Sequence, residues 1–82
     1  MSVMIKKMEK ENGNTFFVAE MNAKEFQVWI GDMIHVVCNN ASHKAWGSIG
    51  GKWFQTIEQA LQNYKSSEAK TIIQAAYDFS KA

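Results

Sequence analysis

Three residues in the middle of this 82-residue chain have the types needed for nucleophilic catalysis. Cys38 could supply a thiolate, His43 a base, and Asp32 a group that orients the base. A cysteine reacts as a thiolate only where its surroundings lower its pKa, and the sequence around Cys38 indicates no such surroundings. Free cysteine is more often a small buried apolar residue. We therefore expect Cys38 to lie in a buried strand and the protein not to be an enzyme.

The potential metal ligands are equally unspecific in their spacing. His35 and His43 could bind a metal ion with Cys38 and Asp32, but the chain has neither a CxxC pair nor a helical HxxxH pair. We expect no metal ion and no other cofactor, with His35 hydrogen-bonded in the core and His43 in a solvated loop. The eight acidic residues are scattered, so no pair is placed for acid–base catalysis.

The segment 45–54, AWGSIGGKWF, has three glycines between two tryptophans. A phosphate-binding loop of the Walker type would need glycine at Trp46 and serine or threonine at Trp53. The glycines are better explained by a tight turn and close strand packing. We interpret this segment as a hairpin that turns at Gly50-Gly51.

In that hairpin Trp46 and Trp53 share one strand face as diagonal neighbours, while Phe54 faces the core. The stretch between Met33 and Ile57 contains no acidic residue, so the face is mildly positive. The candidate binding residues are Trp46, Trp53, Lys44, Lys52, His43 and Ser48. The alternative is that one or both indoles belong to the core of this small domain, because a slip of one residue exchanges the faces.

Composition and length predict one globular domain over residues 1–82. Hydrophobic residues make up 46% of the chain, which is enough for a core and unlike a disordered composition. The single cysteine rules out an internal disulfide and fits a reducing, cytoplasmic environment. The first residues lack the order of charges and apolar residues found in a signal peptide, and no apolar run is long enough to span a membrane.

The charge of the chain gives little support to dedicated nucleic-acid binding. Its net charge is +1, with nine lysines and no arginine. Arginine is the usual residue for bidentate recognition of phosphate and guanine. Affinity for nucleic acid also grows with the number of phosphates neutralised, and a nearly neutral chain neutralises few.

Two hairpins are expected before the glycine-rich segment. The first turns at Asn12-Gly13, a strong hairpin signal. It places Met4, Met8, Phe17, Ala19 and Met21 on one face, interrupted by Lys6, Lys10 and Thr15. The second turns at Gly31-Asp32 in a two-residue type II′ loop. It pairs Ile30 with Met33, Val28 with His35, and Phe26 with Val37, leaving Gln27, Trp29, Ile34, Val36 and Cys38 on the opposite face.

From Thr56 the apolar period changes from 2 to 3.6. Thr56 followed by Gln59 predicts a helix start, and Ser66 or Ser67 can cap a second helix. The inward stripes are Ile57, Ala60, Leu61 and Tyr64, then Ala69, Ile72, Ile73, Ala76 and Phe79 or Ser80. The fold class is therefore α+β: an antiparallel sheet of about five to six strands over 3–55, followed by amphipathic helices over 57–65 and 67–80 on one face.

These features favour a small non-enzymatic protein that acts by stoichiometric contact with another protein. One form of such contact is inhibition of a larger macromolecule; anti-CRISPR proteins and other mobile-element inhibitors share this size and layout, which is analogy alone. The alternative is a module that binds single-stranded nucleic acid or RNA through the tryptophans and lysines. A third possibility is a homodimer formed through an exposed sheet edge.

Overall fold

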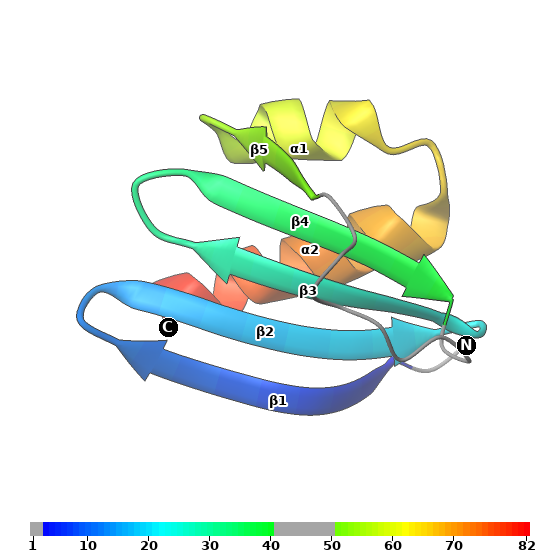
Figure 1. Ribbon diagram of the computed structural model, residues 1–82, viewed down its shortest axis with the longest axis horizontal. Helices are drawn as coiled ribbons and strands as arrows, with labels where there is room; N and C mark the ends of the chain where they lie inside the picture. Colours follow the sequence, from blue (N-terminus) through cyan, green and yellow to red (C-terminus); the bar gives the residue numbers. More distant parts are fainter. Residues whose placement is uncertain (1–2, 41–50) are drawn as a thin grey trace.

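The chain forms five strands followed by two helices. The computed structural model describes residues 3–40 and 51–82. In chain order the elements are β1 (Met4–Glu11), β2 (Asn14–Met21), β3 (Lys24–Ile30), β4 (Ile34–Asn40), β5 (Lys52–Phe54), α1 (Ile57–Asn63) and α2 (Ser67–Lys81). The strands form one antiparallel sheet in the same order, with both helices on one side of it (Figure 1). The predicted α+β class is confirmed.

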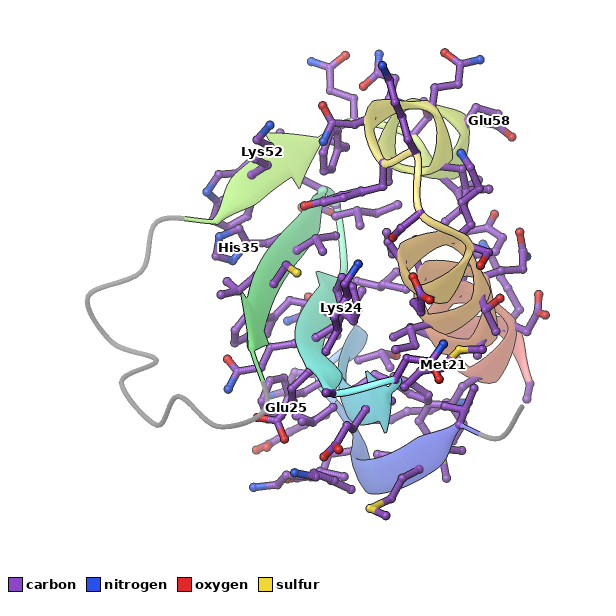
Figure 2. All side chains as sticks on the ribbon, turned by 90° about the vertical axis from the view of Figure 1, so that its right-hand side faces the viewer. Met21, Lys24, Glu25, His35, Lys52 and Glu58 are labelled. Carbon is purple, nitrogen blue, oxygen red and sulfur yellow. The ribbon has the colours of Figure 1, made fainter. Side chains whose placement is uncertain are left out.

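The two sides of the sheet differ in what covers them. The side that the helices cover is called the helix side below, and the opposite side is called the outer face. Figure 2 views the sheet nearly edge-on, with Met21 projecting toward the helices and His35 projecting away from them. Helix α2 packs against β2 and β3, and α1 packs against β4 and β5.

The core lies between the helix side of the sheet and α2. Phe17, Phe26 and Val36 from the sheet and Ile72 and Ile73 from α2 are almost completely buried. The predicted inward stripes of both helices are confirmed, since their central residues all belong to this core. In the part of the chain that the structure describes, neither helix has both the length and the hydropathy needed to cross a membrane.

Both helices begin at the capping residues that the sequence indicates. Oγ1 of Thr56 accepts a hydrogen bond from the backbone N–H of Gln59 at 3.2 Å. Oγ of Ser66 accepts one from the N–H of Ala69, also at 3.2 Å, which selects Ser66 over its neighbour as the cap of α2. These bonds satisfy N–H groups that have no partner within the helix.

Two hairpins turn through pairs of residues with positive φ. Asn12 and Gly13 have φ of 53° and 80°, as the predicted β1–β2 turn requires. The β2–β3 turn at Asn22 and Ala23 has φ of 53° and 64°. The β2–β3 turn was not predicted from the sequence, because Asn-Ala lacks the glycine that marks such turns. Alanine is strained in this region of φ, where its Cβ crowds the backbone.

The predicted face of β1 is wrong near the start of the strand. A bulge between Ile5 and Lys7 shifts the register, so that Met4 pairs with Glu20 on the outer face. Lys6 also reaches the outer face, where its Nζ lies 3.1 Å from a carboxylate oxygen of Glu20. A bulge adds one residue to one strand, and the alternation of residue types does not reveal it.

The predicted connection between β3 and β4 is also wrong. It contains three residues, 31–33, instead of two. Gly31 lacks the positive φ that the first position of a type II′ turn requires, and its N–H donates to the carbonyl oxygen of Met33 at 3.1 Å. A Cβ at Gly31 would lie only 2.1 Å from Oδ1 of Asn14, so a larger residue here would require the exposed Asn14 side chain to move.

The additional residue exchanges the two sides of β4. Ile34, Val36 and Cys38 lie on the helix side, and His35 and Val37 lie on the outer face, opposite to the prediction. Ile34 and Val36 are 4% and 1% exposed. Because burial of an imidazole without a partner is costly, the observed register places the apolar residues under the helices.

The positive φ values predict opposite effects of two substitutions. Ala23→Gly should raise the free energy of unfolding by about 0.5 kcal/mol, because strain relief exceeds the added chain entropy. Gly13→Ala, where no atom would contact the new Cβ, should lower it by about 1 kcal/mol through backbone strain alone. Urea denaturation of both variants measures these shifts. A loss of stability in Ala23→Gly would contradict the described turn.

Candidate functional site

Four rings from four neighbouring strands form a row across the outer face. They are Phe16 of β2, Trp29 of β3, His35 of β4 and Trp53 of β5, and are called the aromatic row below. The register creates it directly, since Phe16 pairs with Trp29, Trp29 with His35, and His35 with Trp53. Residues opposite each other in antiparallel strands point to the same side of the sheet, so the four rings lie side by side.

The rings of the aromatic row stack on one another. The ring centroids are 4.9 Å apart between Phe16 and Trp29, 5.0 Å between Trp29 and His35, and 4.1 Å between His35 and Trp53. The interplanar angles are 27°, 28° and 11° in the same order. Trp29 and His35 therefore have a ring on each side, so a flat ligand cannot stack on either without separating the row.

The two ends of the row differ. Trp53 lies on the edge strand β5 and is 62% exposed, the largest exposed fraction among the exposed apolar residues of the described ranges. At the other end, Nζ of Lys7 lies 5.7 Å from the centre of the Phe16 ring, within reach of a cation–π interaction. The row is thus most accessible at β5.

Gly51 fits closely against the aromatic row. A Cβ at this position would lie 2.2 Å from Nε2 of His35 and 2.8 Å from Cγ2 of Val37. The backbone of residue 51 therefore passes over β4 at a distance that only glycine allows. The predicted hairpin turn at Gly50-Gly51 falls partly outside the described residues, and close approach is a separate reason for glycine at position 51.

Two hollows adjoin the row at the end of the sheet that carries the β3–β4 connection. The larger, of about 500 Å³, is lined by Asn14, Trp29, Ile30, Gly31, Asp32, Met33, His35 and Trp53. The smaller, of about 300 Å³, is lined by Glu9, Glu11, Asn12, Asn14, Thr15, Phe16 and Trp29. Asn14 and Trp29 line both hollows, which are therefore adjacent and are together called the depression below. Its floor is aromatic and its rim is polar, a combination typical of binding surfaces.

The lysines on the outer face are ion-paired within the protein. Lys6 contacts the carboxylates of Glu20 and Glu25, and these two hydrogen-bonded acids raise the pKa of Lys6. Nζ of Lys7 lies 2.9 Å from a carboxylate oxygen of Glu9. The strands of residues 3–40 and 51–82 thus place no unpaired lysine on this face.

Acidic residues border the depression beside the aromatic row. Glu9 and Glu11 border the smaller hollow, and Asp32 borders the larger one beside Trp53. They come from β1 and from the β3–β4 connection, distant in sequence from Trp53. The absence of acids between Met33 and Ile57 therefore does not describe the surface.

The structure separates two of the predicted site residues. Trp53 lies on the outer face, on the side expected, whereas Lys52 pairs with Val36 and so belongs to the helix side of β5. Trp53 and Lys52 therefore lie on opposite sides of β5 and do not form one surface on this strand. The other candidates, Trp46, Lys44, His43 and Ser48, lie outside the described residues. The role of Trp53 in binding stays a prediction.

Three residues of the aromatic row were not among the sequence-predicted site residues. Phe16 and Trp29 alternate with buried residues of β2 and β3, which was a usable signal for their side of the sheet. His35 could not be placed with them, because the predicted two-residue connection assigned it to the core. A predicted connection of three residues between β3 and β4 would have placed His35 on the same side of the sheet as Phe16 and Trp29.

Of the residues considered for thiol chemistry, Cys38 and Asp32 lie toward opposite ends of β4, and His43 lies outside the described residues. Cys38 is exposed on the helix side, near one end of β4, and not in a buried position as expected. Partial burial of the thiol raises its pKa, despite the opposite effect of the nearby Lys24 ammonium. Asp32 precedes the other end of β4. Among residues 3–40 and 51–82, no three His, Cys, Asp or Glu residues are placed to hold a metal ion.

Comparisons with protein-family models, with curated proteins and with solved structures find no match to this chain. Its class is defined by its own fold: a five-stranded antiparallel sheet with two C-terminal helices on one side. The aromatic row and the adjoining depression lie on the side of the sheet that no described helix covers.

Gly51→Ala should disrupt the aromatic row. The new Cβ would collide with His35 and Val37, and the resulting displacement should lower the free energy of unfolding by about 1–3 kcal/mol. The near-ultraviolet circular dichroism of the stacked tryptophans should weaken with it. Gln55→Ala, at an exposed position nearby, is the control and should change neither quantity. An unchanged spectrum in Gly51→Ala would contradict the packing.

The partial burial of His35 predicts a pH dependence of stability. Burial lowers the pKa of His35 relative to the unfolded chain, so protonation favours unfolding. The stability that the neutral His35 imidazole contributes is fully present above a pH of about 6.5, the pKa of histidine in the unfolded chain. It is lost as the pH falls below that value. His35→Phe keeps a ring in the row but does not titrate. Its stability relative to the wild type should therefore rise from about pH 7.5 to about pH 5.5 in thermal unfolding. A constant difference would contradict this.

Proposed function

We propose that this protein is a non-enzymatic binding protein that contacts another protein stoichiometrically through its outer face. The contact surface consists of the aromatic row and the adjoining depression. The observation that carries this proposal is the 62% exposure of Trp53 at the open end of a pre-stacked row. No described helix covers this side of the sheet (Figure 1).

The composition of this surface is that of an interaction site. Tryptophan and other aromatic residues are enriched at the centres of protein interfaces, where they bury much apolar area. Stacking holds Trp29 between Phe16 and His35, so its side chain has little freedom left to lose on binding. Met33, 40% exposed, adds a flexible apolar side chain at the rim of the larger hollow.

A protein partner fits this surface better than a single-stranded nucleic acid. Binding of a nucleic acid requires cations for the phosphates, and Lys6 and Lys7 are already paired with carboxylates. Bases also need open ring faces, and the faces of Trp29 and His35 are occupied by neighbouring rings. Nucleic-acid binding stays a prediction that these contacts do not favour.

The mode of action that follows is occupation of a surface on the partner. Such contact suits an inhibitor of a larger macromolecule, which a domain of this size could block by covering a functional surface. The chemistry would then lie entirely in the partner.

Trp53→Ala should remove the contact without unfolding the protein. Because the side chain is largely exposed, its loss should shift the melting temperature little, whereas loss of an interface anchor should weaken partner binding about 30-fold or more. Thr71→Ala, at an exposed position of α2 on the other side of the molecule, is the matched control and should retain binding. Affinity capture from lysate with the three proteins compares them directly.

Two outcomes would contradict the proposal. One is a partner captured equally by the wild type and by Trp53→Ala, which would place the contact elsewhere. The other is binding of single-stranded oligonucleotides at low salt that weakens steeply as salt is added and disappears in Trp53→Ala, which would favour the nucleic-acid alternative.

A further inference from the structure

Strand β1 is an open edge of the sheet. All eight of its residues are exposed, and within residues 3–40 and 51–82 β2 is its only strand neighbour. Apolar side chains are exposed along it: Met4 is 60%, Ile5 50% and Met8 45% exposed. Helix α2 packs over β2 and β3, leaving β1 beyond its margin (Figure 1). An edge of this length with apolar side chains can pair with another strand, and its three lysines and the bulge between Ile5 and Lys7 restrict that partner to a strand of complementary charge.

The opposite edge of the sheet is much less suited to pairing. β5 has only three residues, and α1 packs against it. Very short edge strands and covering helices are common ways of preventing association between sheets. Of the two edges, β1 is therefore the one that could accept a partner strand.

We propose that β1 pairs antiparallel with β1 of a second copy of this chain, about a two-fold axis that passes through Met8 perpendicular to the sheet. The two five-stranded sheets then become one continuous sheet. This proposal concerns the edge of the sheet and does not depend on the outer-face contact, although Glu9 also borders the smaller hollow.

The direction of the axis follows from the two sides of the sheet. An axis perpendicular to the sheet keeps the helix sides of both copies together, so Met8 meets Met8 of the second copy beside the helix layer. An axis within the sheet plane would place the helix side of one copy next to the outer face of the other. Apolar side chains such as Met8 would then lie opposite charged ones.

The position of the axis follows from the charges of β1. With Met8 on the axis, Lys7 of each copy lies opposite Glu9 of the other, which gives two pairs of opposite charge on the outer face. An axis through Lys7, Glu9 or Lys10 would instead place identical charges directly opposite each other, which is unfavourable. Of the four residues from Lys7 to Lys10, Met8 is the uncharged one, so an axis through Met8 avoids this repulsion.

The remaining like charges are kept apart by the sheet. In this register Lys6 lies opposite Lys10 of the second copy. The ammonium group of Lys6 is held on the outer face by Glu20 and Glu25. The ammonium group of Lys10 donates to the carbonyl oxygen of Ala82 at 2.6 Å, on the helix side. The two ammonium groups are therefore on different sides of the strands.

Disulfide trapping tests the register. Residues directly opposite in antiparallel strands have Cα atoms about 4.5–5.5 Å apart, within the range of a disulfide. Met8→Cys, combined with Cys38→Ser to remove the native thiol, should form a covalent dimer on mild oxidation. Met33→Cys in the same background has similar exposure and should cross-link at least tenfold more slowly. Equal rates for the two variants would overturn the proposal.

Charge exchange tests the interface without a covalent bond. In sedimentation equilibrium, Lys7→Glu should raise the dimer dissociation constant about tenfold, because it places like charges opposite each other. Adding Glu9→Lys to Lys7→Glu should restore dimer formation. Trp53→Ala should leave dimer formation unchanged, which separates this surface from the outer face. A wild type that remains monomeric at millimolar concentration, or a double variant that is not restored, would overturn the proposal.

Discussion

The register between β3 and β4 is the constraint on which the rest of the structure depends. A connection of three residues places Ile34 and Val36 under the helices, where they complete the core. The same register places His35 between Trp29 and Trp53 on the other side of the sheet. A connection one residue shorter would bury the imidazole and break the aromatic row. The length of this connection therefore determines both the core and the candidate site.

The distribution of aromatic residues between the two sides of the sheet is unusual for such a small domain. Phe17 and Phe26 belong to the core, whereas Trp29 and Trp53 lie on the outer face. A domain of about 80 residues buries a limited share of its surface and gains much from each buried aromatic. Stacking recovers part of that contact for the outer rings, and it holds them in the arrangement that a partner would meet.

The outer face and the β1 edge adjoin at Lys7 and Glu9 but differ in their properties. The outer face has stacked rings, a depression and ion-paired lysines, which suit contact with a protein of another kind. The β1 edge has free strand positions and alternating charges that complement a second copy. In the proposed dimer, the perpendicular axis leaves both aromatic rows on the same side of the joined sheet. Two copies of a partner site would then be engaged together, with the gain in affinity that bivalent binding gives.

The sequence by itself determined the features that depend on neighbouring residues. Asn12-Gly13 defines the first turn, and Thr56 and Ser66 define the helix starts, because each acts on backbone groups within a few positions. The change from period 2 to period 3.6 was sufficient for the two-layer class. Only the tertiary structure decided the orientation of β4 and the acidic residues that border the depression. Both sides of β4 carry apolar residues, so its pattern does not specify a face, and the choice falls to the helices that pack on one side. Glu9, Glu11 and Asp32 approach the row from other elements, and spacing along the chain carries no information about that proximity.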